Sequence, residues 1–363
     1  MKYLFILGRN PELSIAEIRS YFKKIENKII KFEQNKNSLL IECEKKIESI
    51  INNLGGTIAI GEVLCFAEPE ELERQEIYLG TKNNIVYVIW DFTNEELYNK
   101  ISEYLKKRFK IEKLKATQKN LTGNLELQDG KYARIASGLI DEEYFVFDNY
   151  FGKIIEKCDY KSLESRDMGK PFRREELSIS PRLAKIMINL SEVKEREKLL
   201  DPFCGIGVIL LETLFQKIRV IGIDNDSDAI DKAMKNIEWE RYSKEHYELI
   251  AGDSRKVVVG NANVIVTEPH LGELLKRILP EKKADTMIKE YENLIIDVLN
   301  NLKKFVSGKI VFTAPLIKTR NKRVSCDVEK ITAKTRLKLA NGFPIQEYRE
   351  SQIIGREIFV LNR

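Results

Sequence analysis

The sequence predicts an α/β protein in which two smaller α/β units precede a doubly wound, mostly parallel sheet. Three observations lead to this class. Strand-like and helix-like apolar patterns alternate along the chain, four strands in its second half each end in an acidic residue, and the first of these runs into a glycine turn. At 363 residues the chain is also too long for one ordinary core, so more than one domain is expected.

The first unit is predicted to be a ferredoxin-like domain over residues 1–67. Its pattern reads strand, helix, strand, strand, helix, strand, which is the split βαβ order. The expected elements are, in order, Lys2–Leu7, Pro11–Lys24, Ile29–Glu33, Leu39–Cys43, Lys45–Leu54 and Thr57–Phe66. Gly55 and Gly56 are expected to stop the second helix.

A second α/β unit is predicted over residues 68–152, after a polar, acidic stretch from Glu68 to Glu76. The expected elements are a strand at Asn84–Phe92, a helix at Asn94–Phe109, and strands at Ala133–Ile140 and Tyr144–Phe147. Residues 159–178 show no clear periodicity, and we interpret 153–178 as a linker. The last domain is expected to cover 179–363.

Composition excludes several classes of protein. Hydrophobic residues make up 43% and charged residues 32% of the chain, which excludes disorder as the main state. Apolar runs fall far short of the roughly 20 residues of a membrane span, and the start does not read as a signal peptide, so a cytoplasmic protein without a membrane anchor is expected. Five scattered cysteines and two histidines argue against a disulfide framework or a metal site.

The net charge of +5 is modest, so any nucleic-acid footprint must be local. Two segments concentrate positive charge. The first contains Lys106, Lys107, Arg108, Lys110, Lys113, Lys115 and Lys119 around one acid, Glu112, and the second contains Lys318, Arg320, Lys322 and Arg323. Each is either a solvated surface or a contact for nucleic-acid phosphates.

Four predicted strands of the last domain end in acids. Leu199-Leu200-Asp201 leads into Pro202-Phe203-Cys204-Gly205-Ile206-Gly207, and the later strand ends supply Asp224, Asp253-Ser254 and Glu268. Because the carboxyl ends of parallel strands meet at one edge, these acids should converge where open α/β sheets bind ligands. A second acid about 20 residues after a glycine turn is typical of a site that holds ribose hydroxyls.

The glycine pattern narrows the choice of ligand. The chain contains neither a full G-x-G-x-x-G after this strand nor a G-x-x-x-x-G-K-[ST] loop, which disfavours a dinucleotide and a P-loop nucleotide. A rim of acids suits a cationic nucleoside without phosphates. S-adenosylmethionine is such a molecule.

At this point the sequence resembles the THUMP-domain RNA methyltransferases with a Rossmann-like catalytic domain, closest to the archaeal and eukaryotic enzymes that methylate N2 of guanine 10 in tRNA. The matching segments, in chain order, are Leu54–Val63, Ser165–Phe172, Ser180–Ala184 with Asn189-Leu190, Asp201–Gly207 and Ile354–Ile358. The resemblance implies that residues 68–152 are a THUMP domain that binds tRNA, for which Lys106, Lys107, Arg108, Lys110 and Lys113 are candidates. Some relatives also require a small activating subunit.

The resemblance also implies roles for the strand-end residues. Asp201, Phe203, Gly205 and Gly207 would bound the methionine part of S-adenosylmethionine, Asp224 would hold the ribose hydroxyls, and Asp253 with Ser254 would lie at the adenine. A helix cap, a turn acid or a core aromatic is the structural alternative for each.

The predicted catalytic segment departs from the family pattern of Asp or Asn, Pro-Pro, and Tyr or Phe, because here it reads Glu268-Pro269-His270-Leu271. The Glu268 carboxylate and the Pro269 carbonyl could still accept the hydrogens of an exocyclic amine and orient its lone pair. Leu271 cannot stack on a flipped base as an aromatic does, whereas His270 could stack, accept a proton or face solvent.

Three functions remain open from the sequence. The first is a tRNA guanine-N2 methyltransferase dependent on S-adenosylmethionine. The second keeps this chemistry but acts on an exocyclic amine of another RNA or of DNA. The third is a catalytically degenerate protein that binds RNA without transferring methyl groups.

Overall fold

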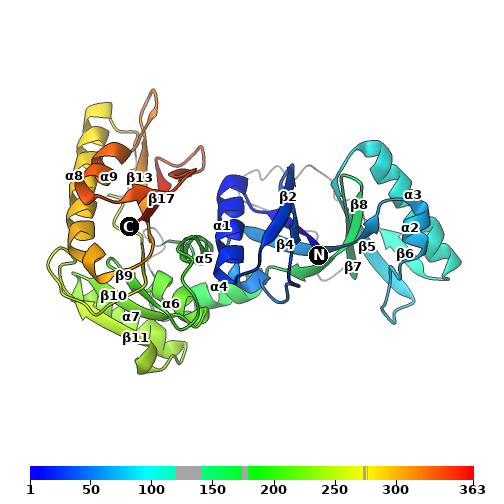
Figure 1. Ribbon diagram of the computed structural model, residues 1–363, viewed down its shortest axis with the longest axis horizontal. Coiled ribbons are helices and arrows are strands. Elements are labelled where there is room, and N and C mark those ends of the chain that lie inside the picture. Colours follow the sequence, from blue (N-terminus) through cyan, green and yellow to red (C-terminus); the bar gives the residue numbers. More distant parts are fainter. Residues whose placement is uncertain (120–139, 174–178, 273–274, 276) are drawn as a thin grey trace. The chain divides into compact units, whose positions relative to one another are not determined.

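The computed structural model describes residues 1–119, 140–173, 179–272, 275 and 277–363 (Figure 1). The chain forms two compact units, and each consists of segments that are not consecutive in the sequence. The first unit contains residues 1–15, 27–52 and 56–158, and the second contains 16–26, 53–55 and 159–363. The end of helix α1 (Pro11–Lys24) therefore belongs to the second unit.

One sheet runs through the first unit. In its order β2-β3-β1-β4-β8-β7-β5-β6, β4 pairs with β8 and so joins the strands of residues 1–66 to those that follow. The strands are β1 (Lys2–Leu7), β2 (Ile29–Asn35), β3 (Ser38–Cys43), β4 (Thr57–Phe66), β5 (Asn84–Phe92), β6 (Lys115–Gln118), β7 (Glu142–Phe147) and β8 (Tyr150–Lys157). The strand expected at 133–140 lies outside the described residues except for its last position. The division of this region into domains 1–67 and 68–152 stays a prediction.

Helix α3 (Glu95–Ile111) confirms the helix expected after β5. Its first turn is capped by Asn94, whose side chain accepts a hydrogen bond from the Leu97 backbone N–H at 2.9 Å. Ile101, Leu105 and Phe109 form its buried face and pack with β5 and β7 residues in one cluster. A short helix, α2 (Pro69–Glu73), lies in the acidic stretch between the two predicted units.

The prediction of a helix at Lys45–Leu54 is wrong, because only a single 3₁₀ turn, Ile51–Asn53, is present there. Side chains from elsewhere bind backbone N–H groups of this segment. The Glu156 carboxylate accepts from Ser49 N at 2.6 Å and Ile51 N at 2.8 Å, and Asn27 Oδ1 accepts from Lys45 N at 2.9 Å. Ser49 also has a φ of 55°, which no α-helix tolerates.

The second unit contains the doubly wound sheet that the sequence predicts. Its order is β11-β10-β9-β12-β13-β17-β15; the first five strands are parallel, and β17 runs antiparallel to β13. The strands are β9 (Lys198–Asp201), β10 (Arg219–Asp224), β11 (Tyr247–Ala251), β12 (Val264–Thr267), β13 (Ile310–Lys318), β14 (Arg323–Val324), β15 (Lys338–Leu339), β16 (Ile345–Glu347) and β17 (Ile354–Asn362). The helices are α4 (Tyr160–Gly169), α5 (Pro181–Leu190), α6 (Val208–Phe215), α7 (Ser227–Trp239), α8 (Glu281–Leu302) and α9 (Val328–Thr335), with 3₁₀ turns at Lys244–His246 and Lys303–Phe305.

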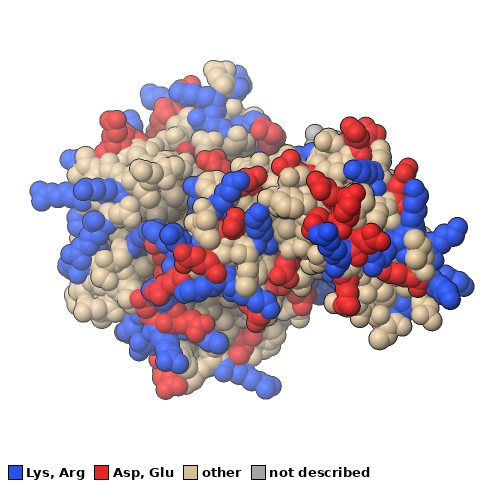
Figure 2. Space-filling model, turned by 45° about the vertical axis from the view of Figure 1, so that its right-hand side comes forward, with Lys and Arg blue, Asp and Glu red and all other residues tan. Residues whose placement is uncertain are grey.

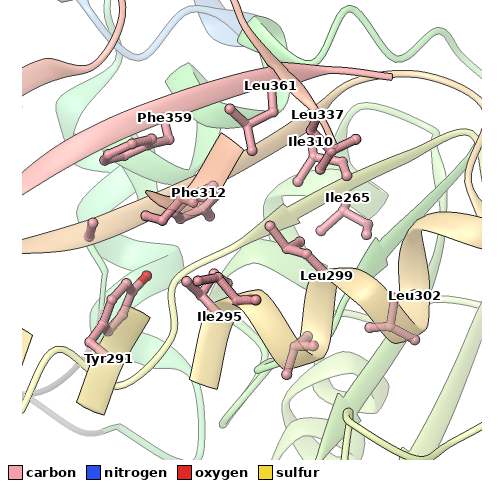
Figure 3. Packing of buried hydrophobic residues seen from close by; sticks show 14 of the residues in the cluster. Ile265, Tyr291, Ile295, Leu299, Leu302, Ile310, Phe312, Leu337, Phe359 and Leu361 are labelled. Carbon is pink, nitrogen blue, oxygen red and sulfur yellow. The ribbon is translucent and has the colours of Figure 1, made fainter. Parts of the chain in front are cut away.

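The largest helix of this unit, α8, packs its apolar face on the middle of the sheet (Figure 3). Ile295 and Leu299 from the helix approach Phe312 of β13 and Ile265 of β12, and all four side chains are buried. Phe312 stacks on Phe359 of β17 with ring centroids 4.9 Å apart. This core holds the ends of β12, β13 and β17 in fixed positions.

The segment without clear periodicity at 159–178 contains helix α4. Asp159 caps this helix by accepting from Ser162 N at 3.0 Å. The helix has no buried residue, and it contacts the unit through charge: the Arg166 guanidinium lies 4.2 Å from the Phe215 ring centroid and 3.8 Å from Glu212. Such contacts leave no apolar period in the sequence.

In the described part of the chain, no helix is long and apolar enough to cross a membrane.

Candidate active site

The reversal point of the sheet lies at β9, which pairs with β10 on one side and β12 on the other. At such a point two connections leave in opposite directions and open a crevice at the carboxyl edge of the sheet. A pocket of about 690 Å³ lies there. It is lined by residues from three of the four predicted strand ends, among them Asp201, Phe203, Gly205, Asp224 and Glu268.

Asp201, the last residue of β9, is only 1% exposed. Its Oδ1 accepts hydrogen bonds from the Thr267 hydroxyl at 2.6 Å and from the Phe203 N–H at 3.2 Å. Burial, with the nearby Asp224 and Glu268 carboxylates, outweighs these bonds and raises the pKa of Asp201 to about 7. A bound cation would relieve this accumulation of negative charge.

The glycine turn brings bare backbone to the same pocket. Gly205 and Gly207 have φ values of 51° and 89°, which residues with a Cβ atom seldom adopt. A Cβ on Gly205 would meet no protein atom within 4 Å, so it would project into the space that a ligand could take. The Gly205 N–H donates to Asp224 Oδ2 at 2.8 Å, which ties the turn to the end of β10. Phe203, half-buried, lines the wall.

Asp224 keeps its carboxylate at the pocket. Its Oδ1 accepts from Asp226 N at 3.0 Å and its Oδ2 from Gly205 N, so each oxygen has a further lone pair for a hydroxyl donor. Asn225 and Asp226 also line the pocket. Sequence reasoning missed these two residues, although they directly follow a predicted strand-end acid.

Asp253 and Ser254 are not brought into this pocket. The Asp253 carboxylate is bound by the Arg255 guanidinium at 2.8 to 3.1 Å and by the Arg255 backbone N–H, which lowers the pKa of Asp253 to about 2. The Ser254 hydroxyl is buried and donates to the Pro202 carbonyl at 2.6 Å. In this arrangement Asp253 is a turn acid, and its assignment to the adenine stays a prediction.

Glu268, which follows β12, is held by residues from two other strands. Arg356 of β17 forms two hydrogen bonds with it, from Nε to Oε2 at 2.7 Å and from Nη2 to Oε1 at 3.0 Å. The Thr313 hydroxyl of β13 donates to Oε2 at 3.1 Å. Burial lowers the pKa of Arg356. The hydrogen bonds to Glu268 and the negative charge of that carboxylate outweigh this effect, so the pKa of Arg356 is raised. Arg356 also lines the pocket.

A carboxylate offers about four lone-pair sites, and three donors reach Glu268. One site on Oε1 therefore remains for a donor in the pocket. Sequence reasoning did not find Arg356 or Thr313 as site residues, because nothing local connects positions 268, 313 and 356 before the sheet is assembled.

The remaining residues of the catalytic segment differ in exposure. Pro269 is buried, His270 is exposed, and both line the pocket. Leu271 is half-buried and packs against the core below the sheet edge. Of these three residues, His270 alone is exposed at the pocket.

The basic cluster of α3 lies in the first unit and is only partly available. Lys106, Lys107, Lys110 and Lys113 are exposed. Arg108 instead forms an ion pair with Glu112 and donates to the Glu73 carbonyl at 3.2 Å. On the face shown in Figure 2, lysines and arginines intermingle with acids rather than forming one continuous basic surface. On this face, contacts for a polyanion must therefore be local.

Comparison with known proteins gives matches to methyltransferases. The family model described as RMKL-like, methyltransferase domain matches residues 171–301. A probable tRNA (guanine(10)-N2)-dimethyltransferase from Methanothermococcus thermolithotrophicus is 31% identical over 156 residues, which are 41% of this chain and 85% of that protein. The tRNA (guanine(10)-N2)-dimethyltransferase of Pyrococcus abyssi is 24% identical over 328 residues, 87% of this chain and 88% of that protein.

Two further matches differ in extent. The tRNA (guanine(10)-N2)-dimethyltransferase of Methanothermobacter thermautotrophicus is 33% identical over 139 residues, but this match covers only 38% of the chain and 39% of that protein. Among solved structures, TrmN from Thermus thermophilus aligns over the full length of both chains with a TM-score of 0.50 and 14% identity, which is a likeness of fold.

Proposed function

Because the chain belongs to the tRNA (guanine(10)-N2)-dimethyltransferase family, we propose that it transfers methyl groups from S-adenosylmethionine to the exocyclic N2 amine of guanine 10 in tRNA. One observation of the structure supports this most directly. A single pocket joins the glycine turn and the Asp201 and Asp224 carboxylates to Glu268, so a cofactor and an amine acceptor would meet in one place. The proposal includes action in the cytoplasm, where its tRNA substrate would be.

The residues of the pocket fit S-adenosylmethionine. Asp201 and Asp224 supply negative charge for a sulfonium cation, and Asp224 retains lone pairs for ribose hydroxyls. The open space at Gly205 lets a ligand approach the backbone. When bound, the cofactor supplies an electrophilic methyl group, and the chain's own residues bring the nucleophile to it.

Glu268 would orient the amine of guanine. The N2 lone pair is delocalised into the ring, so the amine attacks well only when its hydrogens are held and the lone pair is turned towards the methyl group. The free lone-pair site on Glu268 Oε1 accepts one amino hydrogen, and the Pro269 carbonyl accepts the other. Arg356 and Thr313 keep the carboxylate from rotating. His270 would stack on the flipped base.

The test is transfer of radiolabelled methyl from S-adenosylmethionine to unmodified tRNA transcripts, followed by nucleoside analysis. We expect N2-methylguanosine or its dimethyl form, and no label in a transcript whose guanine 10 is replaced by adenosine. Ribosomal RNA and duplex DNA serve as competing substrates. Tight tRNA binding without label would instead favour a degenerate RNA-binding protein. Methyl transfer by the chain alone would exclude the need for a small activating subunit, and transfer only with an added partner would establish one.

A change at Glu268 tests the mechanism. Glu268→Ala should lower kcat at least about a hundredfold, the scale for removing a group that orients the reacting atoms, while the Kd values for cofactor and tRNA change little. Glu268→Gln keeps one acceptor oxygen and should lose less. Equal turnover of the alanine variant and the native protein would remove Glu268 from the mechanism.

A further inference from the structure

Two loops of the second unit lie against each other beside the pocket. The first joins β13 to β14 and contains residues 319–322, and the second precedes β17 and contains residues 349–353 (Figure 1, orange to red). The Lys318 backbone N–H donates to the Ile353 carbonyl at 2.7 Å, and the Lys318 ammonium donates to the Glu350 carbonyl at 2.8 Å. Arg323 donates to the Gln352 carbonyl at 3.1 Å. The loops therefore form one surface.

This surface carries positive charge that carboxylates do not neutralise. Arg320 and Arg349 are exposed, and neither forms an ion pair within the described residues. Among the described residues, Lys318 and Arg323 form hydrogen bonds only with carbonyl groups. The Arg323 guanidinium also lies 4.0 Å from the Tyr348 ring centroid. One terminal nitrogen of Arg323 is buried and has no hydrogen-bond acceptor in the described structure. We call Lys318, Arg320, Arg323 and Arg349 the basic rim.

The charged residues near the basic rim determine the local net charge of this surface. Lys322, at the tip of the same hairpin, differs from the basic rim because it forms an ion pair with Glu281 at 2.6 Å. Glu350 is an exposed acid in the second loop. The basic rim thus presents four cations against this one carboxylate, which is a local excess that the charge of the whole chain does not reveal.

The basic rim continues directly into the pocket wall. Gln352, Ile353 and Ile354 line the same pocket as Glu268, and they follow Arg349 within five positions of the chain. A base can reach Glu268 only after it is turned out of its stack, and its own sugar and phosphates then remain at the mouth of the pocket. Cations at that mouth lie where these phosphates must pass.

We infer that the basic rim binds the RNA phosphates that flank the nucleotide to be methylated, an inference that rests on the proposed function. It makes the hairpin and the loop before β17 a second RNA contact besides the candidate lysines of α3. Phosphate contacts fix the position and register of a nucleic acid without reading its sequence. The basic rim would therefore select the placement of the target nucleotide, whereas the pocket selects the base.

The experiment compares Arg320→Gln/Arg349→Gln with Lys322→Gln in the full chain. These positions share a surface and are exposed, so their replacement should leave the fold intact, and melting temperatures check this. We measure tRNA binding by filter retention from about 50 to 200 mM salt, together with kcat and KM for tRNA methylation. The double variant should weaken binding at least about tenfold and reduce the slope of log K against log salt by about 2, because each lost phosphate contact contributes about 0.9.

The inference also predicts a split in the kinetics. KM for tRNA should rise with the loss of binding, while kcat at saturating tRNA stays within about twofold. Lys322→Gln should match the native protein within about twofold in every measurement, because its charge is already paired. If the double variant and Lys322→Gln have the same salt slope, the inference is overturned. Failure of the native protein to methylate tRNA would reject the proposed function alone, since the binding slopes still decide whether the basic rim contacts RNA.

Discussion

The surroundings of Asp201 change its acid–base chemistry. Burial and two neighbouring carboxylates raise its pKa to about 7, so near neutral pH it holds its proton about half of the time. In the unfolded chain the same group loses its proton near pH 4. Between these values the folded state binds the extra proton, and the free energy of unfolding must fall as the pH rises through this window.

We expect the free energy of unfolding to decline between about pH 4 and pH 7 by as much as roughly 1.4 kcal/mol per pH unit from this group alone. Chemical denaturation at several pH values across this window measures it. Asp201→Asn removes the titrating group but keeps an acceptor for the Thr267 hydroxyl, so the decline should be smaller in this variant. Identical pH profiles for the two proteins would contradict the assignment.

We propose that Arg356 is a positioning residue, because its two hydrogen bonds hold the Glu268 carboxylate. Arg356→Met should leave the Glu268 carboxylate with Thr313 alone, destabilise the fold by about 3 kcal/mol and lower kcat at least about tenfold. Arg356→Lys keeps the charge but loses the paired geometry, so it should be more stable than Arg356→Met yet still impaired in kcat. A variant that loses stability but keeps its kcat in the folded fraction would show a purely structural role.

At the scale of elements, one buried side chain connects helix α7 to two loops. Asn236 is fully buried; its Nδ2 donates to the Phe172 carbonyl at 3.1 Å and the Ile206 carbonyl at 3.0 Å, and its Oδ1 accepts from Phe172 N at 3.0 Å. Ile206 lies between the two glycines of the pocket turn. The helix therefore anchors the turn from below.

Asn236→Ala should lower the free energy of unfolding by about 2 to 4 kcal/mol, because it leaves buried backbone groups without partners. We also expect weaker cofactor binding, since the glycine turn loses an anchor. Asp231→Ala, an exposed change on the same helix, should cost no more than about 0.5 kcal/mol. Urea denaturation and cofactor titration of both variants provide the comparison, and equal losses would reject the anchoring role.

An element could be predicted where its own residues stabilise it. It could not be predicted where residues far away in the sequence determine its structure. Helix α3 has its own cap and apolar face, so its residues alone indicate it. The segment at 45–54 has helical periodicity, but Glu156 takes its N–H groups from more than 100 positions away. The site follows the same rule: Asp201 and Asp224 end apolar strands that are visible in the sequence, whereas the Glu268–Arg356 pair spans 88 positions and needs the assembled sheet.

At the scale of the whole molecule, a polyanion would meet lysines in the first unit as well. Replacing Lys106, Lys107 and Lys110 by Gln should reduce the salt slope of tRNA binding by about 2 to 3, if each contacts one phosphate. Arg108→Gln is the matched control, because Arg108 is already paired with Glu112, and it should change the slope by less than about 0.5. Equal slopes in the triple variant and the native protein would return this cluster to an ordinary solvated surface.

The second unit is not continuous in sequence. Glu17 of α1 is fully buried and its Oε1 accepts from the Gly55 N–H at 2.7 Å and from Asn189 Nδ2 at 2.8 Å, and all three residues belong to this unit. A fragment of residues 179–363, the domain predicted from sequence, lacks two of these three groups. We expect it to be insoluble or to melt at least about 10 °C below the full chain by circular dichroism. An equally stable fragment would support the predicted boundary.

The Glu17–Asn189 contact also limits when the second unit can form during synthesis. Glu17 is synthesised before Asn189, which follows 172 positions later. At about 5 to 20 residues per second, this interval lasts roughly 10 to 35 s. During translation the Glu17 carboxylate stays hydrated until Asn189 has been synthesised, so this contact of the second unit can form only after that interval.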